Sequence, residues 1–157
     1  MISFSVSRLE KEDIRLEGTE PPEFVLLAGS EPFTVTSPVH YDLLVSGVSG
    51  GALVTGKCDV EITGECGRCL VTVSRRLETG EFRIFVDVPV GTERCDISED
   101  VRTEITLALP MNLLCREDCR GLCPVCGADR NKVSCSCRTE TNSGGSGVWA
   151  ALDDLEL

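Results

Sequence analysis

The sequence predicts an α+β fold that is mainly β. We expect a curved antiparallel sheet or partial barrel, with one or two helices and a small C-terminal cysteine-rich metal module. Three observations support this: apolar and polar residues alternate through most of the first ninety positions, one segment near residue 100 changes to helical spacing, and six of the ten cysteines lie within residues 115–137. A chain of 157 residues can form one sizeable core plus a small appended module.

The strand pattern begins at the N-terminus. Residues 2–7 alternate apolar side chains with serine, which predicts a half-buried strand. Residues 10–23 are rich in charge and end close to two prolines, so they are expected to form a connector. Short strands are then expected at 24–27 and 33–35.

The clearest β signal is a predicted hairpin. Residues 39–48 and 52–63 flank the turn Ser49-Gly50-Gly51. In the second arm, apolar residues alternate with charged and hydroxyl residues, and Cys58 falls on the apolar face, so one face of the sheet should be wet. Further strands are expected at 70–77 and 82–88.

The period then changes from two to that of a helix. Val101, Ile105 and Leu109 recur at helical spacing and Pro110 follows, which predicts a helix near 98–109. The expected organisation is a β-rich body at 1–111, a cysteine-rich zinc module at 112–138, a flexible linker at 139–147 and a short docking helix at 148–157.

Charge and composition narrow the partners and the compartment. The net charge is −11, and residues 1–111 hold 19 acidic against 10 basic side chains. Such a body repels phosphate backbones and suits a basic protein partner better.

No apolar run is long enough for a membrane span and the first residues do not read as a signal peptide, so we expect a soluble cytoplasmic protein. A reducing compartment favours metal binding over disulfides.

The C-terminal cysteines predict a structural metal site. Cys123 and Cys126 lie in a Cys-Pro-x-Cys-Gly knuckle, whose turn aims two sulfurs at one point. The second pair of ligands is either Cys135 and Cys137, which we favour, or one or both of Cys115 and Cys119, which are spaced to share a helical face. Zinc is the expected metal and iron the second choice, because a rubredoxin-like site uses the same knuckle. Four thiolates leave no position for water, so hydrolytic catalysis is not expected.

A second Cys-x-x-C motif, Cys66-Gly67-Arg68-Cys69, joins two expected strands. We interpret it as a tight β-corner with small buried thiols and an exposed arginine. The alternative is a thiol redox protein that uses Cys66 and Cys69, but that chemistry needs the motif to open a helix. Since 53 residues lie between Cys69 and Cys123, pairing with the C-terminal knuckle in a zinc ribbon is not expected.

The case for an enzyme is weak. His40 is the only histidine, and the sequence has no phosphate loop, nucleotide fingerprint or nucleophile elbow. We therefore expect neither catalysis nor a small-molecule substrate. Basic side chains are the candidate binding residues, either as contacts to RNA phosphates or as compensation for a tetrathiolate zinc centre: Arg68, Arg116, Arg120, Arg130 and Lys132.

Four segments together resemble the YceD family, bacterial and plastid proteins needed for the accumulation of large-subunit ribosomal RNA. They are Gly64 to Leu70, Leu107 to Pro110, the cysteine segment from Leu114 through Gly127 to Cys137, and Trp149 to Leu152. The resemblance implies a non-enzymatic ribosome-biogenesis factor that supports 23S ribosomal RNA. Its implied partners are large-subunit assembly components: a basic ribosomal protein, a maturation factor or ribosomal RNA. A general protein-interaction module without a ribosomal role is the alternative.

Overall fold

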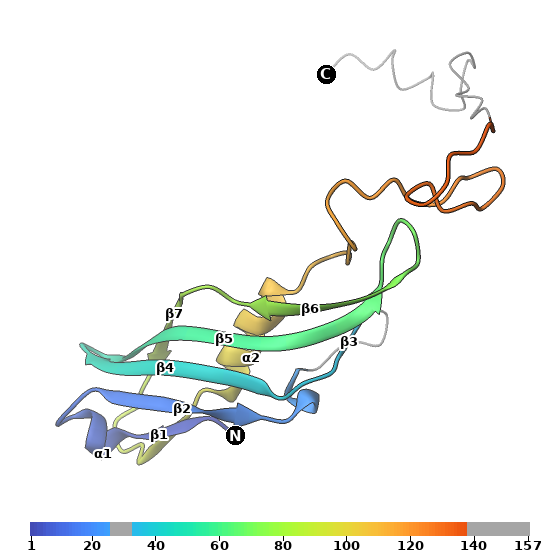
Figure 1. Cartoon of the computed structure of the whole chain (residues 1–157). Helices are drawn as coiled ribbons and strands as arrows, with labels where there is room; N and C mark the ends of the chain where they lie inside the picture. The colour runs from blue at the N-terminus through green and yellow to red at the C-terminus, as the bar shows by residue number, and fades with distance from the viewer. Residues whose placement is uncertain (26–32, 138–157) are drawn as a thin grey trace, which may run out of the picture. The chain divides into compact units, whose positions relative to one another are not determined.

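The computed structural model describes residues 1–25 and 33–137 (Figure 1). The chain divides into two compact units, Met1–Cys119 and Arg120–Leu157. The division falls after Cys119 and not near residue 111, where the sequence suggested the body would end. The linker and docking helix expected at 139–147 and 148–157 lie outside the described residues.

The first unit contains all the helices and strands of the described part of the chain. In order, these are β1 (Ser3–Ser5), α1 (Val6–Leu9), β2 (Ile14–Glu20), the 3-10 turn η1 (Pro22–Phe24), β3 (Phe33–Val35), β4 (Val39–Val48), β5 (Gly51–Glu65), β6 (Thr72–Glu78), β7 (Phe82–Asp87), β8 (Arg94–Asp96) and α2 (Ser98–Ala108). None of the helices in the described residues is long and apolar enough to cross a membrane.

Strand β5 organises the main sheet. Along one edge it pairs first with β4 and then with β3, and along the other edge first with β7 and then with β6. Strand β2 extends the sheet beyond β4, while β1 and β8 form a separate two-stranded sheet. All pairings are antiparallel and neither sheet closes. The predicted fold class, mainly β with an open antiparallel sheet and helices, is therefore confirmed.

The β4–β5 hairpin has the predicted turn and facing. Val48 pairs with Gly51, so Ser49 and Gly50 form a two-residue loop, and Gly50 takes a φ of 87° that favours glycine. The apolar positions of β5 alternate inward and are at most 2% exposed: Ala52, Val54, Cys58, Val60 and Ile62. The alternation in the sequence thus correctly predicts which face of β5 is buried and which is exposed to solvent.

Gly56 lies where β5 exchanges one partner for another. The pairing with β7 ends at Gly56, and the pairing with β6 begins at Asp59. A Cβ atom at position 56 would lie 2.2 Å from the Asp42 carbonyl oxygen and 2.8 Å from Leu43 Cα. The close approach of β4 therefore requires glycine here.

The expected connector at 10–23 is wrong, because Ile14–Glu20 forms strand β2 on the edge of the sheet. Arg15 and Glu17 face outward, and the Arg15 guanidinium donates to both carboxylate oxygens of Asp42 on β4, at 3.0 and 2.9 Å. Phe24 lies in η1 and not in the short strand expected at 24–27, a segment described only to residue 25. An edge strand with one exposed face can carry many charges, and this concealed β2 in the sequence.

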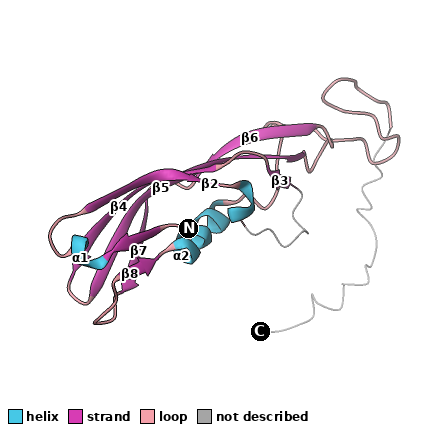
Figure 2. Cartoon of the chain, turned by 90° about the horizontal axis from the view of Figure 1, so that it is seen from below, coloured by secondary structure: helices cyan, strands magenta, loops and turns pink. Residues whose placement is uncertain are grey.

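Helix α2 packs against the sheet (Figures 1 and 2). Val101 and Ile105 are fully buried in the same core as Leu43 and Val54. The segment that follows α2 contributes Leu113 to this core, only 1% exposed.

Candidate metal centres

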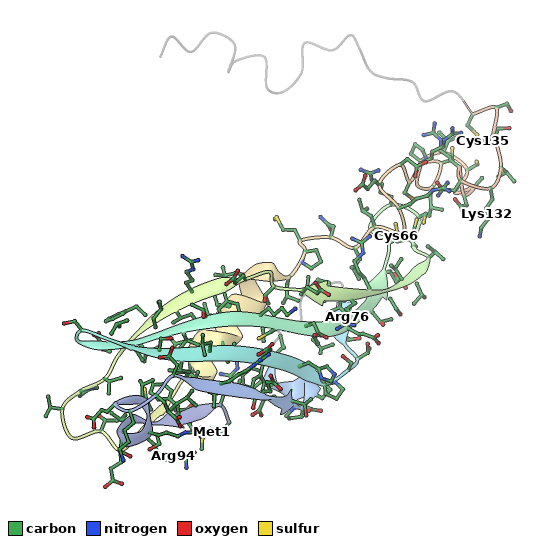
Figure 3. The ribbon with its side chains drawn as sticks, turned by 60° about the vertical axis from the view of Figure 1, so that its left-hand side comes forward. Met1, Cys66, Arg76, Arg94, Lys132 and Cys135 are labelled. Atoms are coloured by element: carbon green, nitrogen blue, oxygen red, sulfur yellow. The ribbon has the colours of Figure 1, made fainter. Side chains whose placement is uncertain are left out.

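The first cysteine cluster lies in the body. Cys66 and Cys69 occupy the corner between β5 and β6, while Cys115 and Cys119 come from the segment after α2. Their four sulfurs all lie within 4.8 Å of one another. Cys66, Cys69 and Cys119 are buried, at 0%, 8% and 4% exposure. Figure 3 labels Cys66 at this corner, beyond the ends of the two strands. We call these four residues the body cluster.

Hydrogen bonds to backbone carbonyls hold the two halves of the body cluster together. The Gly67 amide donates to the Leu113 carbonyl at 2.8 Å. The Arg68 guanidinium donates to the carbonyls of Glu117 and Cys119, each at 3.0 Å. Arg68, which the sequence offered as a binding residue, therefore ties the corner to the segment that carries the other two sulfurs.

The second cluster lies in the second unit and is the predicted set. The sulfurs of Cys123, Cys126, Cys135 and Cys137 all lie within 4.8 Å of one another. Cys123 is buried and Cys126 is exposed, so this cluster is more open to solvent than the body cluster. We call it the module cluster. Figure 3 labels Cys135, one of its members.

The structure brings the six C-terminal cysteines into two different clusters, one of which includes the Cys66–Cys69 corner. Cys135 and Cys137 join Cys123 and Cys126, whereas the alternates Cys115 and Cys119 join the Cys66–Cys69 corner. The corner is a turn with buried thiols, as the sequence predicts, and it also lies against Cys115 and Cys119, which the sequence does not predict. The available signal was the repeated Cys-x-x-C spacing at residues 66–69 and 123–126.

Backbone amides favour ionisation of the first cysteine in each Cys-x-x-C turn. Hydrogen bonds from the amides of Cys115, Arg68 and Cys69 lower the pKa of Cys66 to about 6. Amides of Cys126 and Val125 likewise lower the pKa of Cys123 to about 6.

Neighbouring thiols respond in the opposite direction. Burial, together with hydrogen bonds that the Cys115 thiol donates to Cys119 and Cys69, raises the pKa of Cys115 to about 12. Cys58 lies in the core outside both clusters, and burial raises its pKa to about 12 as well. Four thiolates in one place need a cation to offset their repulsion, whereas a lone core thiol stays neutral.

Both clusters have the donor set and spacing of a mononuclear tetrathiolate site. Zinc–sulfur bonds of about 2.3 Å place tetrahedral sulfurs about 3.8 Å apart. In the body cluster, the sulfurs of Cys66 and Cys119 are 3.9 Å apart and those of Cys69 and Cys115 are 3.6 Å apart. Thiolates that bind separate irons of an iron–sulfur cluster are spread more widely. Cys123, Cys126, Cys135 and Cys137 can hold one ion in the same way, as can Cys66, Cys69, Cys115 and Cys119.

The other candidate binding residues lie around these centres. Arg116 forms an exposed ion pair with Asp118, at 3.3 Å, and Lys132 pairs with Asp129, at 3.5 Å. Arg120 and Arg130 line a cavity of about 140 Å³ that Cys123, Cys135 and Cys137 also line. Positive side chains in these positions offset the −2 charge that four thiolates and one divalent ion would carry.

The fold and the two centres define a mainly β protein with two tetrathiol clusters. The chain belongs to the YceD family: residues 54–156 match the family described as large ribosomal RNA subunit accumulation protein YceD. The predicted resemblance is therefore confirmed.

Four relatives illustrate the family. Uncharacterised proteins of Mycobacterium tuberculosis H37Rv and Mycobacterium leprae are 35% and 30% identical over 100 and 105 residues, which is 55% and 58% of this chain and 48% of each relative. The chloroplastic large ribosomal RNA subunit accumulation protein YCED homolog 1 is 35% identical over 57 residues in Zea mays and 34% over 64 in Arabidopsis thaliana. Those matches cover 36% and 41% of this chain and 20% of each relative. The matches thus span about half the length of the mycobacterial relatives. No solved structure matches.

Proposed function

We propose that this protein is a non-enzymatic factor that supports the accumulation of large-subunit (23S) ribosomal RNA. One observation carries the proposal: residues 54–156, which include most of β5, strands β6 to β8, α2 and both clusters, match a family described by that role. The plant relatives are named for the same role.

The proposed mode of action is binding and not catalysis. An ion held by four thiolates has no open position for water or substrate, so each cluster is suited to holding structure. The cytoplasm is the proposed compartment, since large-subunit RNA accumulates there in bacteria.

Charge favours a basic protein as the direct partner. Residues 1–111 carry nine more acidic than basic side chains, so electrostatic attraction steers them toward a basic ribosomal protein or maturation factor. Precursor RNA would have to be contacted through the basic residues around the module cluster, Arg120, Arg130 and Lys132.

Depletion tests the proposed function. Cells depleted of the protein are expected to lose 23S relative to 16S ribosomal RNA, and the intact gene should restore the ratio. An unchanged ratio at full depletion would contradict the proposal. Affinity capture from extract with and without ribonuclease then identifies the partner: ribonuclease-resistant capture of a basic large-subunit protein supports a protein contact, and loss of all capture supports RNA.

A further inference from the structure

The two Cys-x-x-C turns have the same hydrogen bonds, although only one carries the proline and glycine of a metal knuckle. The Leu70 amide donates to the Cys66 carbonyl at 2.9 Å, as the Gly127 amide does to Cys123. The Cys66 amide donates to the Val71 carbonyl at 2.8 Å, as Cys123 does to Ala128.

The residue after each turn also has the same conformation. Leu70 has a φ of 61° and Gly127 a φ of 72°. This left-handed conformation costs a leucine about 1–2 kcal/mol, so something must hold the corner in it. The corner at residues 66–69 therefore has the geometry of a metal knuckle without its usual sequence.

The segment opposite this corner has little else to order it. Between α2 and the second unit, Leu113 is the one buried apolar side chain of residues 111–119 other than cysteine. No helix or strand forms in these residues. The sulfurs of Cys115 and Cys119 nevertheless meet the corner at 3.6 and 3.9 Å, too far for disulfide bonds and close to a tetrahedral edge.

We propose that Cys66, Cys69, Cys115 and Cys119 hold a second structural zinc ion, which fastens the segment after α2 to the β5–β6 corner. The protein then carries two zinc ions per chain, one in each unit. This inference goes beyond the proposed function and does not depend on it. The body site is shielded from solvent by the burial of Cys66, Cys69 and Cys119, so its ion should exchange more slowly than the ion of the module cluster.

Elemental analysis of the full chain, purified under reducing conditions without added metal, tests the stoichiometry. We expect two zinc ions in the native protein and one in the Cys123→Ser/Cys126→Ser variant. The matched control is Cys95→Ser, which removes a half-buried cysteine outside both clusters and should leave two. A protein with one zinc that falls to none in Cys123→Ser/Cys126→Ser would overturn the proposal. Stoichiometric iron at the retained site would overturn the assignment to zinc.

Two further measurements report on the body cluster without substituting any of its four cysteines. Brief alkylation of the native protein, followed by peptide mapping, should leave Cys66, Cys69, Cys115 and Cys119 unmodified until a chelator or acid releases zinc. In the Cys123→Ser/Cys126→Ser variant, cobalt should give the absorption of a tetrahedral tetrathiolate. Rapid labelling of all four thiols in native protein, or their recovery as disulfide-linked peptides, would contradict a zinc site.

Discussion

Leu70 has a positive φ, which no other non-glycine residue in the described part of the chain has. Its side chain is 58% exposed, so little packing offsets the strain. We expect Leu70→Gly to raise the free energy of unfolding by about 0.5–1 kcal/mol, because relief of the left-handed strain exceeds the added freedom of the unfolded glycine. Urea unfolding of the zinc-loaded protein measures this change.

The matched change in the other knuckle should have the opposite sign. Gly127 has open space where a Cβ would lie, so Gly127→Ala adds strain without a clash. We expect it to weaken zinc binding at the module cluster about fivefold, which corresponds to about 1 kcal/mol.

A loss of stability in Leu70→Gly would contradict the first of these two predictions, because it would show that the leucine side chain contributes packing that the strain argument omits.

At the scale of single residues, sequence reasoning was strongest where composition and turn chemistry coincide. The proline and glycine of the Cys-Pro-x-Cys-Gly knuckle mark Cys123 and Cys126 as candidate metal ligands, and Cys135 and Cys137 lie close by in the sequence. Cys66 and Cys115 are 49 positions apart, and only the sheet and α2 bring them together. The Cys-x-x-C spacing marks the corner at 66–69 as a candidate knuckle, but nothing in the local sequence indicates that Cys115 and Cys119 are its partners.

The start of helix α2 depends on a carboxylate. Asp96 accepts a hydrogen bond from the Ser98 amide at 2.8 Å, and the Ser98 hydroxyl and amide lower the pKa of Asp96. A carboxyl whose folded pKa is lowered stabilises the protein above its unfolded pKa and loses that contribution as the pH falls through the folded value. We expect Asp96→Ala to cost about 0.5–1 kcal/mol at pH 7 and progressively less as the pH falls below the unfolded pKa and through the lowered folded pKa. Urea unfolding between pH 7 and 2 tests this, with Asp87→Ala, an exposed carboxylate on β7, as the control.

The close approach of β4 to β5 leaves no room for a side chain at Gly56. Gly56→Ala would place a methyl group 2.2 Å from a backbone oxygen of β4, and backbone cannot step aside as a side chain can. We expect a loss of about 2–4 kcal/mol in the free energy of unfolding. Gly47→Ala on β4 is the control, since its Cβ would meet Leu9 at ordinary contact distances of 3.5 and 3.7 Å and should change stability by about 0.5 kcal/mol or less. Equal losses in the two variants would contradict the steric argument.

Among the elements, those with one buried face were predictable and the edge was not. The alternation in β4 and β5 and the helical spacing at Val101 and Ile105 reflect burial, which selects apolar residues at fixed intervals. Strand β2 is fixed instead by its pairing with β4 and by cross-strand contacts such as Arg15 with Asp42. Ile14 and Leu16 do alternate with Arg15 and Glu17 in β2, but this alternation covers only four residues before Gly18 and is set among many charges.

On the scale of the whole molecule, residue periodicity predicted the fold class, and short motifs predicted the family that the comparisons confirm. Neither source could place the boundary between the units, because Cys115 and Cys119 belong by sequence to the cysteine-rich stretch and by contact to the body. The division after Cys119 keeps Cys115 and Cys119 in the same unit as Cys66 and Cys69, a long-range grouping that composition does not record.

The pairing of β5 with four other strands sets a limit on how the protein can be shortened. The family match begins at residue 54, inside β5. A fragment cut there would lack β2, β3 and β4, so one whole side of β5 would present unpaired amides and carbonyls above a bared apolar face. Unpaired strand edges of this kind form hydrogen bonds with strands of other chains, which leads to aggregation. We expect residues 54–157 expressed alone to aggregate, whereas the full chain stays monodisperse in size-exclusion chromatography; a soluble, zinc-loaded fragment would show that the first strands are dispensable to the fold.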